Sequence, residues 1–224
     1  MEVSPDLWEA ADDFRFLLNR GYPRDASLEL IGNRYSLDRD YRHLLRRGVF
    51  AASVAGERRS KKASLEEIRG KAVAIDGYNC LITLESALKA KTIVLADDAF
   101  IRDISGVSGT YRDAPETTQA LDLIIDLLIA AASAEVLFLF DAPISGSGKL
   151  AARIRALMAE RGLFGDAQAV KVPEKIMVGY QGIIATSDTA LIDQSKQVFD
   201  LAGHLITQHL RIPFIDMAKS TIAP

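Results

Sequence analysis

Three aspartates in this 224-residue chain each follow an apolar run: Asp76 after AVAI, Asp141 after VLFLF and Asp188 after IIATS. Because the carboxyl ends of parallel strands meet at one edge of a sheet, we expect these side chains to lie close together. Neighbouring carboxylates repel one another, and a hard divalent cation such as Mg²⁺ or Mn²⁺ relieves that repulsion. The pattern therefore predicts a metal or phosphate site. For Asp76 alone, the alternative is a carboxylate that only caps the following turn.

The elements that would position these aspartates are strands separated by helices. Apolar runs predict strands at Ala72–Asp76, 92–96, Glu135–Asp141, 167–172, 182–188 and 212–215. Helical spacing predicts helices at 80–89, with Asn79 as its cap, and at 115–132, 147–161 and 189–210, whereas 101–113 is interpreted as a loop or short hairpin. Such alternation favours an α/β fold with a doubly wound, mostly parallel sheet.

The N-terminal third has a different pattern. Helical spacing predicts three short helices at Pro5–Asn19, 25–31 and 37–47, which resemble a helix-turn-helix unit and indicate a small all-α domain. Residues 38–62 contain eight Lys or Arg against three acids, in a chain whose net charge is −3. This stretch suits phosphate contacts, with Arg42, Arg46 and Arg47 as candidates. The alternative is a solvated helix followed by a charged linker at 55–63.

We therefore predict a helical domain at 1–63, with nucleic-acid binding as its candidate role, and an α/β domain at 64–224. Composition supports a globular protein, since 49% of residues are hydrophobic and 25% are charged. The single cysteine, Cys80, excludes an internal disulfide and fits a reducing cytoplasm. The acidic start has no signal-peptide core, and acids interrupt the apolar segment 121–140, so we expect a cytoplasmic protein without membrane contact.

Three short motifs, DGYN at 76–79, FDA at 140–142 and ATSD at 185–188, resemble in order those of the NYN ribonucleases, which are PIN-like nucleases. The resemblance covers roughly residues 71–194. It implies a PIN-like sheet in which Asp76, Asp141 and Asp188 are catalytic metal ligands for Mg²⁺ or Mn²⁺. It also implies that Asn79 orients a ligand or scissile phosphate, that RNA is the partner, and that a homodimer is expected.

This chain departs from the NYN pattern at one point. A further acidic motif of the family is replaced by VPEKI at 172–176, so another carboxylate is needed as fourth ligand. Glu174 is one alternative, and the others follow the second predicted strand: Asp97, Asp98 and Asp103, of which Asp98 is the metal ligand that we predict. The whole chain also resembles an uncharacterised, mostly archaeal family that joins a small helical domain to a PIN-like domain.

Two groups of residues near the predicted site are candidates for contacts to nucleic-acid phosphates. Ser145, Ser147 and Lys149 lie in a glycine-containing segment that follows Asp141 and opens a helix, where free backbone N–H groups bind phosphate. Arg102 and Arg112 flank the loop after the second strand. The alternatives are a flexible turn in the first case and solvated surface arginines in the second.

Taken together, the motifs predict a metal-dependent nuclease. This hydrolase would use water as the nucleophile to cleave phosphodiester bonds, and RNA is its expected substrate. The alternative is a non-catalytic nucleic-acid-binding or regulatory protein whose PIN-like domain has decayed. A phosphatase of the haloacid dehalogenase type is disfavoured because it requires a second aspartate at position 78, where this chain has Tyr78.

Overall fold

The structure, a computed structural model, describes residues 5–105 and 111–219. The chain forms two compact units. The unit that we call the α/β unit consists of Lys61–Lys89 and Ser105–Ile212. The other, the helical unit, contains the chain up to Ser60, Ala90–Ile104 and the segment that starts at Pro213. This division differs from the predicted boundary at 63 because two segments from beyond it belong to the helical unit.

The α/β unit is built on a five-stranded sheet whose order is β5-β4-β1-β6-β7. Every pairing in this sheet is parallel. The strands are β1 (Ala72–Asp76), β4 (Glu135–Asp141), β5 (Gly165–Val170), β6 (Ile183–Ala185) and β7 (Val198–Phe199). Apolar residues of β1 and β4 are buried without alternation, as expected for strands that are covered on both faces. The predicted α/β fold with a parallel sheet is confirmed.

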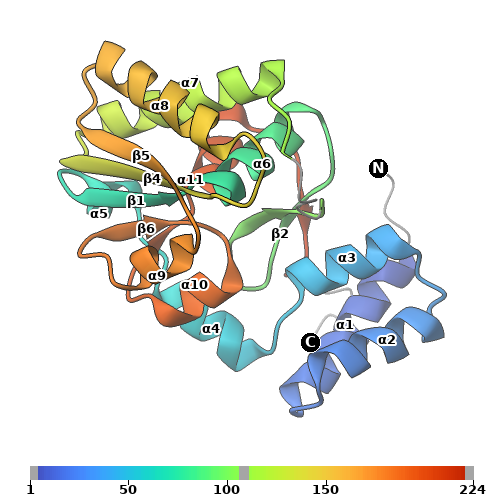
Figure 1. The fold of residues 1–224 in the computed structure, drawn as a ribbon. Helices are drawn as coiled ribbons and strands as arrows, with labels where there is room; N and C mark the ends of the chain where they lie inside the picture. Colours follow the sequence, from blue (N-terminus) through green and yellow to red (C-terminus); the bar gives the residue numbers. More distant parts are fainter. Residues whose placement is uncertain (1–4, 106–110, 220–224) are drawn as a thin grey trace. The chain divides into compact units, whose positions relative to one another are not determined.

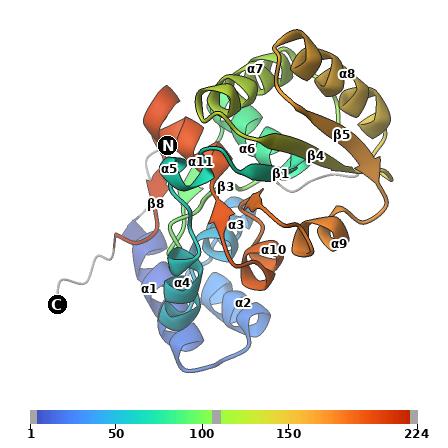
Figure 2. The same cartoon turned by 90° about the vertical axis from the view of Figure 1, so that its left-hand side faces the viewer.

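Helices cover both faces of this sheet, as Figures 1 and 2 show. On one face lie α6 (Gly77–Leu88), α7 (Pro115–Ala130) and α8 (Ser147–Glu160), and on the other lie α9 (Pro173–Val178) and α10 (Thr189–Gln194). The unit also contains α5 (Leu65–Ile68), α11 (Leu201–His204) and the π-helix η1 (Leu205–Leu210). The sheet is therefore wound on both sides by its connections.

The helical unit combines four helices with a small sheet. Its helices are α1 (Pro5–Asn19), α2 (Arg24–Arg34), α3 (Arg39–Gly48) and α4 (Ala52–Ser60). Its sheet has the order β3-β2-β8 and consists of β2 (Ile93–Leu95), β3 (Ile101–Asp103) and β8 (Ile215–Asp216). Phe14 and Leu44 share one apolar core with Val94 of β2 and with Met217. The prediction of an all-α domain is therefore wrong, because later segments complete the core of these helices.

Several predicted elements differ from the observed ones. The strands at 92–96 and 212–215 belong to the small sheet of the helical unit, and helix α4 occupies most of the predicted linker 55–63. The predicted helix 189–210 is interrupted by β7, which pairs with β6. A new helix then begins because Asp200 accepts a hydrogen bond from the Gly203 amide. Part of the predicted loop 101–113 forms β3, and its residues 106–110 lie outside the described residues.

Among the described residues, we find no helix with the length and apolar character that crossing a bilayer requires.

Close packing at the start of α6 makes a first prediction. An added Cβ on Gly77 would lie 2.2 Å from Cε1 of the fully buried Phe140. We expect Gly77→Ala to lower the free energy of unfolding by about 1–3 kcal/mol, measured by denaturant titration. Gly148→Ala is the control, because its Cβ would meet no atom within 4 Å and it also lies in the first turn of a helix. An unchanged stability of Gly77→Ala would contradict this packing.

Candidate functional site at the carboxyl edge of the parallel sheet

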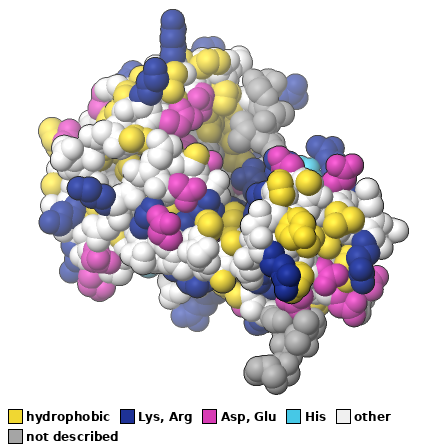
Figure 3. Space-filling view, turned by 90° about the horizontal axis from the view of Figure 1, so that it is seen from below, with side chains coloured by type: hydrophobic (Ala, Val, Ile, Leu, Met, Phe, Trp, Pro, Cys, Tyr) yellow, Lys and Arg dark blue, Asp and Glu magenta, His cyan; other side chains and the backbone are white. Residues whose placement is uncertain are grey.

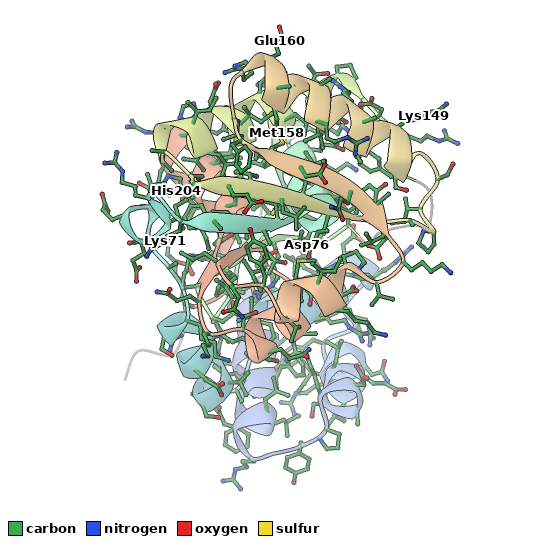
Figure 4. All side chains as sticks on the ribbon, turned by 60° about the vertical axis from the view of Figure 1, so that its left-hand side comes forward. Lys71, Asp76, Lys149, Met158, Glu160 and His204 are labelled. Atoms are coloured by element: carbon green, nitrogen blue, oxygen red, sulfur yellow. The ribbon has the colours of Figure 1, made fainter. Side chains whose placement is uncertain are left out.

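The three motif aspartates lie at the carboxyl ends of three adjacent strands. Asp76 is the last residue of β1 and Asp141 the last of β4, while Asp188 follows β6 and caps α10. The central strand β1 pairs with both neighbours, since Asp76 is in register with Leu139 and Ile75 with Ala185. Figure 4 shows Asp76 at one end of β1 and Lys71 at the other. The structure thus brings the three aspartates to one edge of the sheet.

The strand order places part of this edge at a point where the winding reverses. From β1 the chain continues to β4 and β5 on one side, and then to β6 and β7 on the other side of β1. Doubly wound sheets bind ligands in the crevice outside the strand ends at such a reversal. Asp76 and Asp188 flank this point from β1 and β6.

A threonine connects the two sides of the reversal. Thr186 donates a hydrogen bond from Oγ1 to Oδ2 of Asp76 at 2.8 Å, and the same Oγ1 accepts from the Asp188 amide at 3.0 Å. Asp188 Oδ1 accepts from two amides of the first turn of α10, those of Ala190 and Leu191. Thr186 was not among the predicted site residues, although its position within the ATSD motif was a usable signal.

The side chain of Asn79 is hydrogen-bonded to another residue of the chain, Ser187. Its Oδ1 accepts hydrogen bonds from the amide of Ser187 at 2.8 Å and from Oγ of Ser187 at 3.0 Å. Helix α6 begins at Gly77 and is capped by Asp76, so the prediction that Asn79 caps it is wrong. Asn79 therefore holds the turn after β6 against the turn after β1. Its Nδ2 makes no hydrogen bond with the described residues.

Burial and neighbouring negative charges make Asp76 and Asp141 difficult to ionise. Burial raises the pKa of Asp76 to about 7, the hydrogen bond from Thr186 opposes the rise, and the charges of Asp188 and Asp141 add to it. The pKa of Asp141 is also raised, first by burial and then by the charge of Glu174. Each of these carboxylates would ionise more easily beside a cation.

The effect of the Glu174 charge on the pKa of Asp141 makes Glu174 relevant to the question of which carboxylate is the fourth metal ligand. Glu174 lies in the first turn of α9, directly after β5, and its side chain is exposed. It is the one alternative for the fourth ligand that belongs to the α/β unit together with the three aspartates.

The prediction that Asp98 is a metal ligand is wrong. Asp98 is fully buried in the helical unit and accepts two hydrogen bonds from Arg102, at 2.7 and 2.9 Å, with Arg58 at 3.4 Å. Arginine already neutralises this carboxylate. The same pairing corrects the prediction for Arg102, which is 2% exposed and therefore has no surface to offer to a nucleic acid.

The remaining candidates for phosphate contacts in the α/β unit differ in exposure. Arg112, Ser145 and Lys149 are exposed, and in Figure 4 the side chain of Lys149 extends outward from the start of α8. Ser147 is buried, and its hydroxyl donates to the Ala142 carbonyl at 3.3 Å. Ser147 therefore stabilises the turn before α8, and its hydroxyl is not directed to solvent.

The predicted phosphate-binding arginines of the helical unit also differ in exposure and in hydrogen bonding. Arg42 donates to the Leu37 carbonyl and to Oδ1 of Asn33, both at 2.9 Å, so it fixes the turn between α2 and α3. Arg46 is exposed and pairs with Asp25 at 3.3 Å, and Arg47 is partly buried. A groove of about 480 Å³ between α2 and α3 is lined by Asp25, Leu28, Glu29, Arg39, Arg42, His43 and Arg46. Figure 3 likewise shows Lys and Arg mixed with Asp and Glu on the face that it presents.

Within the part of the chain that the structure describes, no group of three or more His, Cys, Asp or Glu side chains is close enough to hold a metal ion. Mg²⁺ commonly binds through one or two carboxylates and several waters. Asp76 with one of its two neighbouring aspartates, Asp141 or Asp188, fits that mode of binding.

The fold and the site thus define an α/β protein with carboxylates at the reversal point of a parallel sheet and with an N-terminal helical region. The chain belongs to the family described as a domain of unknown function (DUF5616), which matches residues 65–204. Residues 6–61 match a second family, described as a protein of unknown function (DUF434).

One relative has been found in an archaeon. The uncharacterized protein MJ0935 of Methanocaldococcus jannaschii is 33% identical over 200 residues, which cover 88% of this chain and 95% of that protein. No solved structure matches the chain. The predicted resemblance to an uncharacterised archaeal family with two parts is confirmed in this coarser form. Neither family description names a nuclease, so the resemblance to NYN ribonucleases stays a prediction.

Proposed function

We propose that the edge formed by Asp76, Asp141 and Asp188 is the active site of a divalent-cation-dependent nuclease that hydrolyses phosphodiester bonds in RNA. The observation that carries the proposal is the position of the three carboxylates, which end adjacent parallel strands at the reversal of the winding. The order of the DGYN, FDA and ATSD motifs, which resembles that of NYN and PIN-like nucleases, supports it.

The chemistry of the site fits Mg²⁺ or Mn²⁺. Carboxylate oxygens are hard ligands, and because burial raises the pKa values of Asp76 and Asp141, a bound cation would stabilise their charged forms. A bound divalent cation would supply Lewis acidity toward the phosphate and lower the pKa of a water molecule. Asp76 together with Asp141 or Asp188 would hold the cation through one or two carboxylates and several waters. Glu174, whose charge acts on Asp141, is an additional carboxylate.

The other residues of the edge have supporting roles in this proposal. Thr186 fixes the carboxylate of Asp76 by its hydrogen bond, and Asn79 fixes the turn that carries Asp188 by its bonds to Ser187. Preorganised ligands of this kind need no rearrangement when a charged substrate arrives. Exposed Lys149 and Arg112 are the candidates for contacts to the RNA backbone in this unit, and Arg46 in the helical unit.

The test is cleavage of labelled single-stranded RNA, hairpin RNA and DNA with Mg²⁺, with Mn²⁺ and with a chelator. We expect cation-dependent cleavage of RNA that the chelator stops. We also expect saturating Mn²⁺ to raise the Tm by about 5 °C or more, because the cation binds only the folded protein.

Two other outcomes would contradict the proposal. If Mn²⁺ shifts the Tm but no substrate is cut, the site binds a cation without this activity. If RNA binds with no cleavage and no cation effect, the alternative of a non-catalytic nucleic-acid-binding protein replaces the nuclease.

A further inference from the structure

The side chain of Tyr78 ends in a buried hydroxyl. Tyr78 is 3% exposed, and its Oη makes no hydrogen bond with any of the residues that the structure describes. Its ring is held between two others, with the Tyr111 ring centroid at 5.0 Å and the Phe140 ring, edge-on, at 5.1 Å. Tyr111 is itself fixed by hydrogen bonds to Glu85 and Thr117. The direction of the Tyr78 hydroxyl is therefore determined by packing.

Folding alone does not explain this hydroxyl. A buried polar group without a partner destabilises a protein, and phenylalanine would fill the same space without that penalty. Such an orphaned group is a reason to look for a ligand or a water that is bound nearby.

The surroundings of Tyr78 connect it to the carboxylate edge. It lies in the first turn of α6, two residues after Asp76, and its ring contacts Phe140, which directly precedes Asp141. The charge of Asp141 is close enough to act on the phenol. A phenolic hydroxyl can donate as well as accept a hydrogen bond.

We propose that the Tyr78 hydroxyl donates a hydrogen bond to an oxygen of a phosphate group bound at the carboxylate edge, which makes Tyr78 a substrate-binding residue. This inference rests on the proposed function, whose phosphodiester substrate it extends by one contact. Carboxylates only accept hydrogen bonds and repel phosphate, so an anionic substrate there requires donors as well as a cation. The Tyr78 hydroxyl, whose ring is held by packing, supplies one.

The variant that tests the proposal is Tyr78→Phe, which removes the hydroxyl and keeps the ring. The matched control is Tyr180→Phe, because the Tyr180 hydroxyl is also buried and has no hydrogen-bond partner among the described residues. Tyr180 lies near Glu135, the first residue of β4, whereas Tyr78 lies near Asp141, the last. The two substitutions remove the same hydroxyl group, Tyr78→Phe near the carboxyl end of β4 and Tyr180→Phe near its amino end.

Three measurements are made on each full-length variant: the Tm without ligand, the shift of the Tm by inorganic phosphate in Mg²⁺, and kcat/KM on labelled RNA. For Tyr78→Phe we expect a Tm no lower than that of the wild type and loss of the phosphate-induced shift of the Tm. We also expect kcat/KM to fall by a factor of up to about ten. For Tyr180→Phe we expect the wild-type phosphate shift and the wild-type kcat/KM.

Each result decides the proposal. If Tyr78→Phe retains the phosphate shift and kcat/KM, the hydroxyl meets only water and the proposal is overturned, whereas the nuclease stands if RNA is still cut. A lower Tm for Tyr78→Phe would mean that the hydroxyl has a partner within the protein, which also overturns it. If the wild type cuts no RNA but the phosphate shift is lost only in Tyr78→Phe, the contact is supported and the nuclease fails.

Discussion

Asp76→Asn should lower cation-dependent cleavage of RNA by about a thousandfold or more, equivalent to about 4 kcal/mol of transition-state stabilisation. Asp76 ends the central strand β1, and its carboxylate interacts with the charges of both Asp141 and Asp188. Asparagine keeps the shape and the acceptor for Thr186 but removes the charge that holds the cation. Rates measured at saturating Mn²⁺ under single-turnover conditions isolate the chemical step.

The same substitution should stabilise the cation-free protein at pH 8. The pKa of Asp76 is raised from 3.8 to about 7 in the folded protein. Between these values the folded state holds a proton that the unfolded state has released, so the free energy of unfolding falls as the pH rises from about 4 to 7. Above pH 7 the full loss applies, and it amounts to at most about 4 kcal/mol. The asparagine side chain of the variant carries no charge to bury, so the variant should lack this decline.

The control for both measurements is Glu135→Gln, which removes an exposed carboxylate at the opposite end of β4. It should leave the cleavage rate and the pH dependence of stability unchanged. Denaturant titrations at pH 5 and pH 8 in the presence of a chelator provide the comparison. Cleavage by Asp76→Asn at the wild-type rate would remove Asp76 from the catalytic site, and a stability decline equal to that of the wild type would contradict its raised pKa.

The strands that form the centre of the site are those that the sequence determines most strongly. The bounds of β1 and β4 agree with their predicted ranges because each is an uninterrupted apolar run that ends at an aspartate. Since both strands are parallel and adjacent, the positions of Asp76 and Asp141 follow from local pattern and a general rule of sheet geometry. The placement of these two residues at strand ends therefore required no tertiary information, whereas the adjacency of the two strands did.

Other parts depended on contacts that local pattern does not contain. The run at 92–96 has the same character as β1, yet β2 pairs with β3 and β8 in a separate sheet. An apolar run predicts a strand but not its partner, and this is why Asp98 was assigned to the wrong site. In α4, the basic residues suggested a linker, whereas Arg58 is 6% exposed and pairs with Asp98. β7 is too short, at two residues, to produce a period.

The roles of the small polar residues could be predicted only in part. Thr186 and Asn79 both lie in recognisable motifs, but their hydrogen bonds join the end of β1 to the turn after β6. These segments are more than 100 residues apart in sequence, and their contact follows from the order of the strands. That order, with β1 between β4 and β6, does not follow from the pattern of any single strand.

The second large effect that we expect is on stability: Asp98→Asn should lower the free energy of unfolding by about 3–5 kcal/mol. The side chains of Asp98 and Arg102 are 0% and 2% exposed, and Arg58 is the second arginine at this carboxylate. Removing the charge leaves two buried guanidinium groups without their common counter-charge, and this penalty exceeds the value of an intact pair. The change is measured by denaturant titration.

The matched control for Asp98→Asn is Asp25→Asn, which breaks another aspartate–arginine pair in the same unit. Asp25 and Arg46 lie 3.3 Å apart with side chains that are 80% and 60% exposed, so their loss should change stability by less than about 1 kcal/mol. Asp98→Asn should also retain the Mn²⁺-induced rise in Tm, because Asp98 belongs to the helical unit and is neutralised by arginine. A variant that keeps its stability but loses the Mn²⁺ effect would restore Asp98 as a metal ligand.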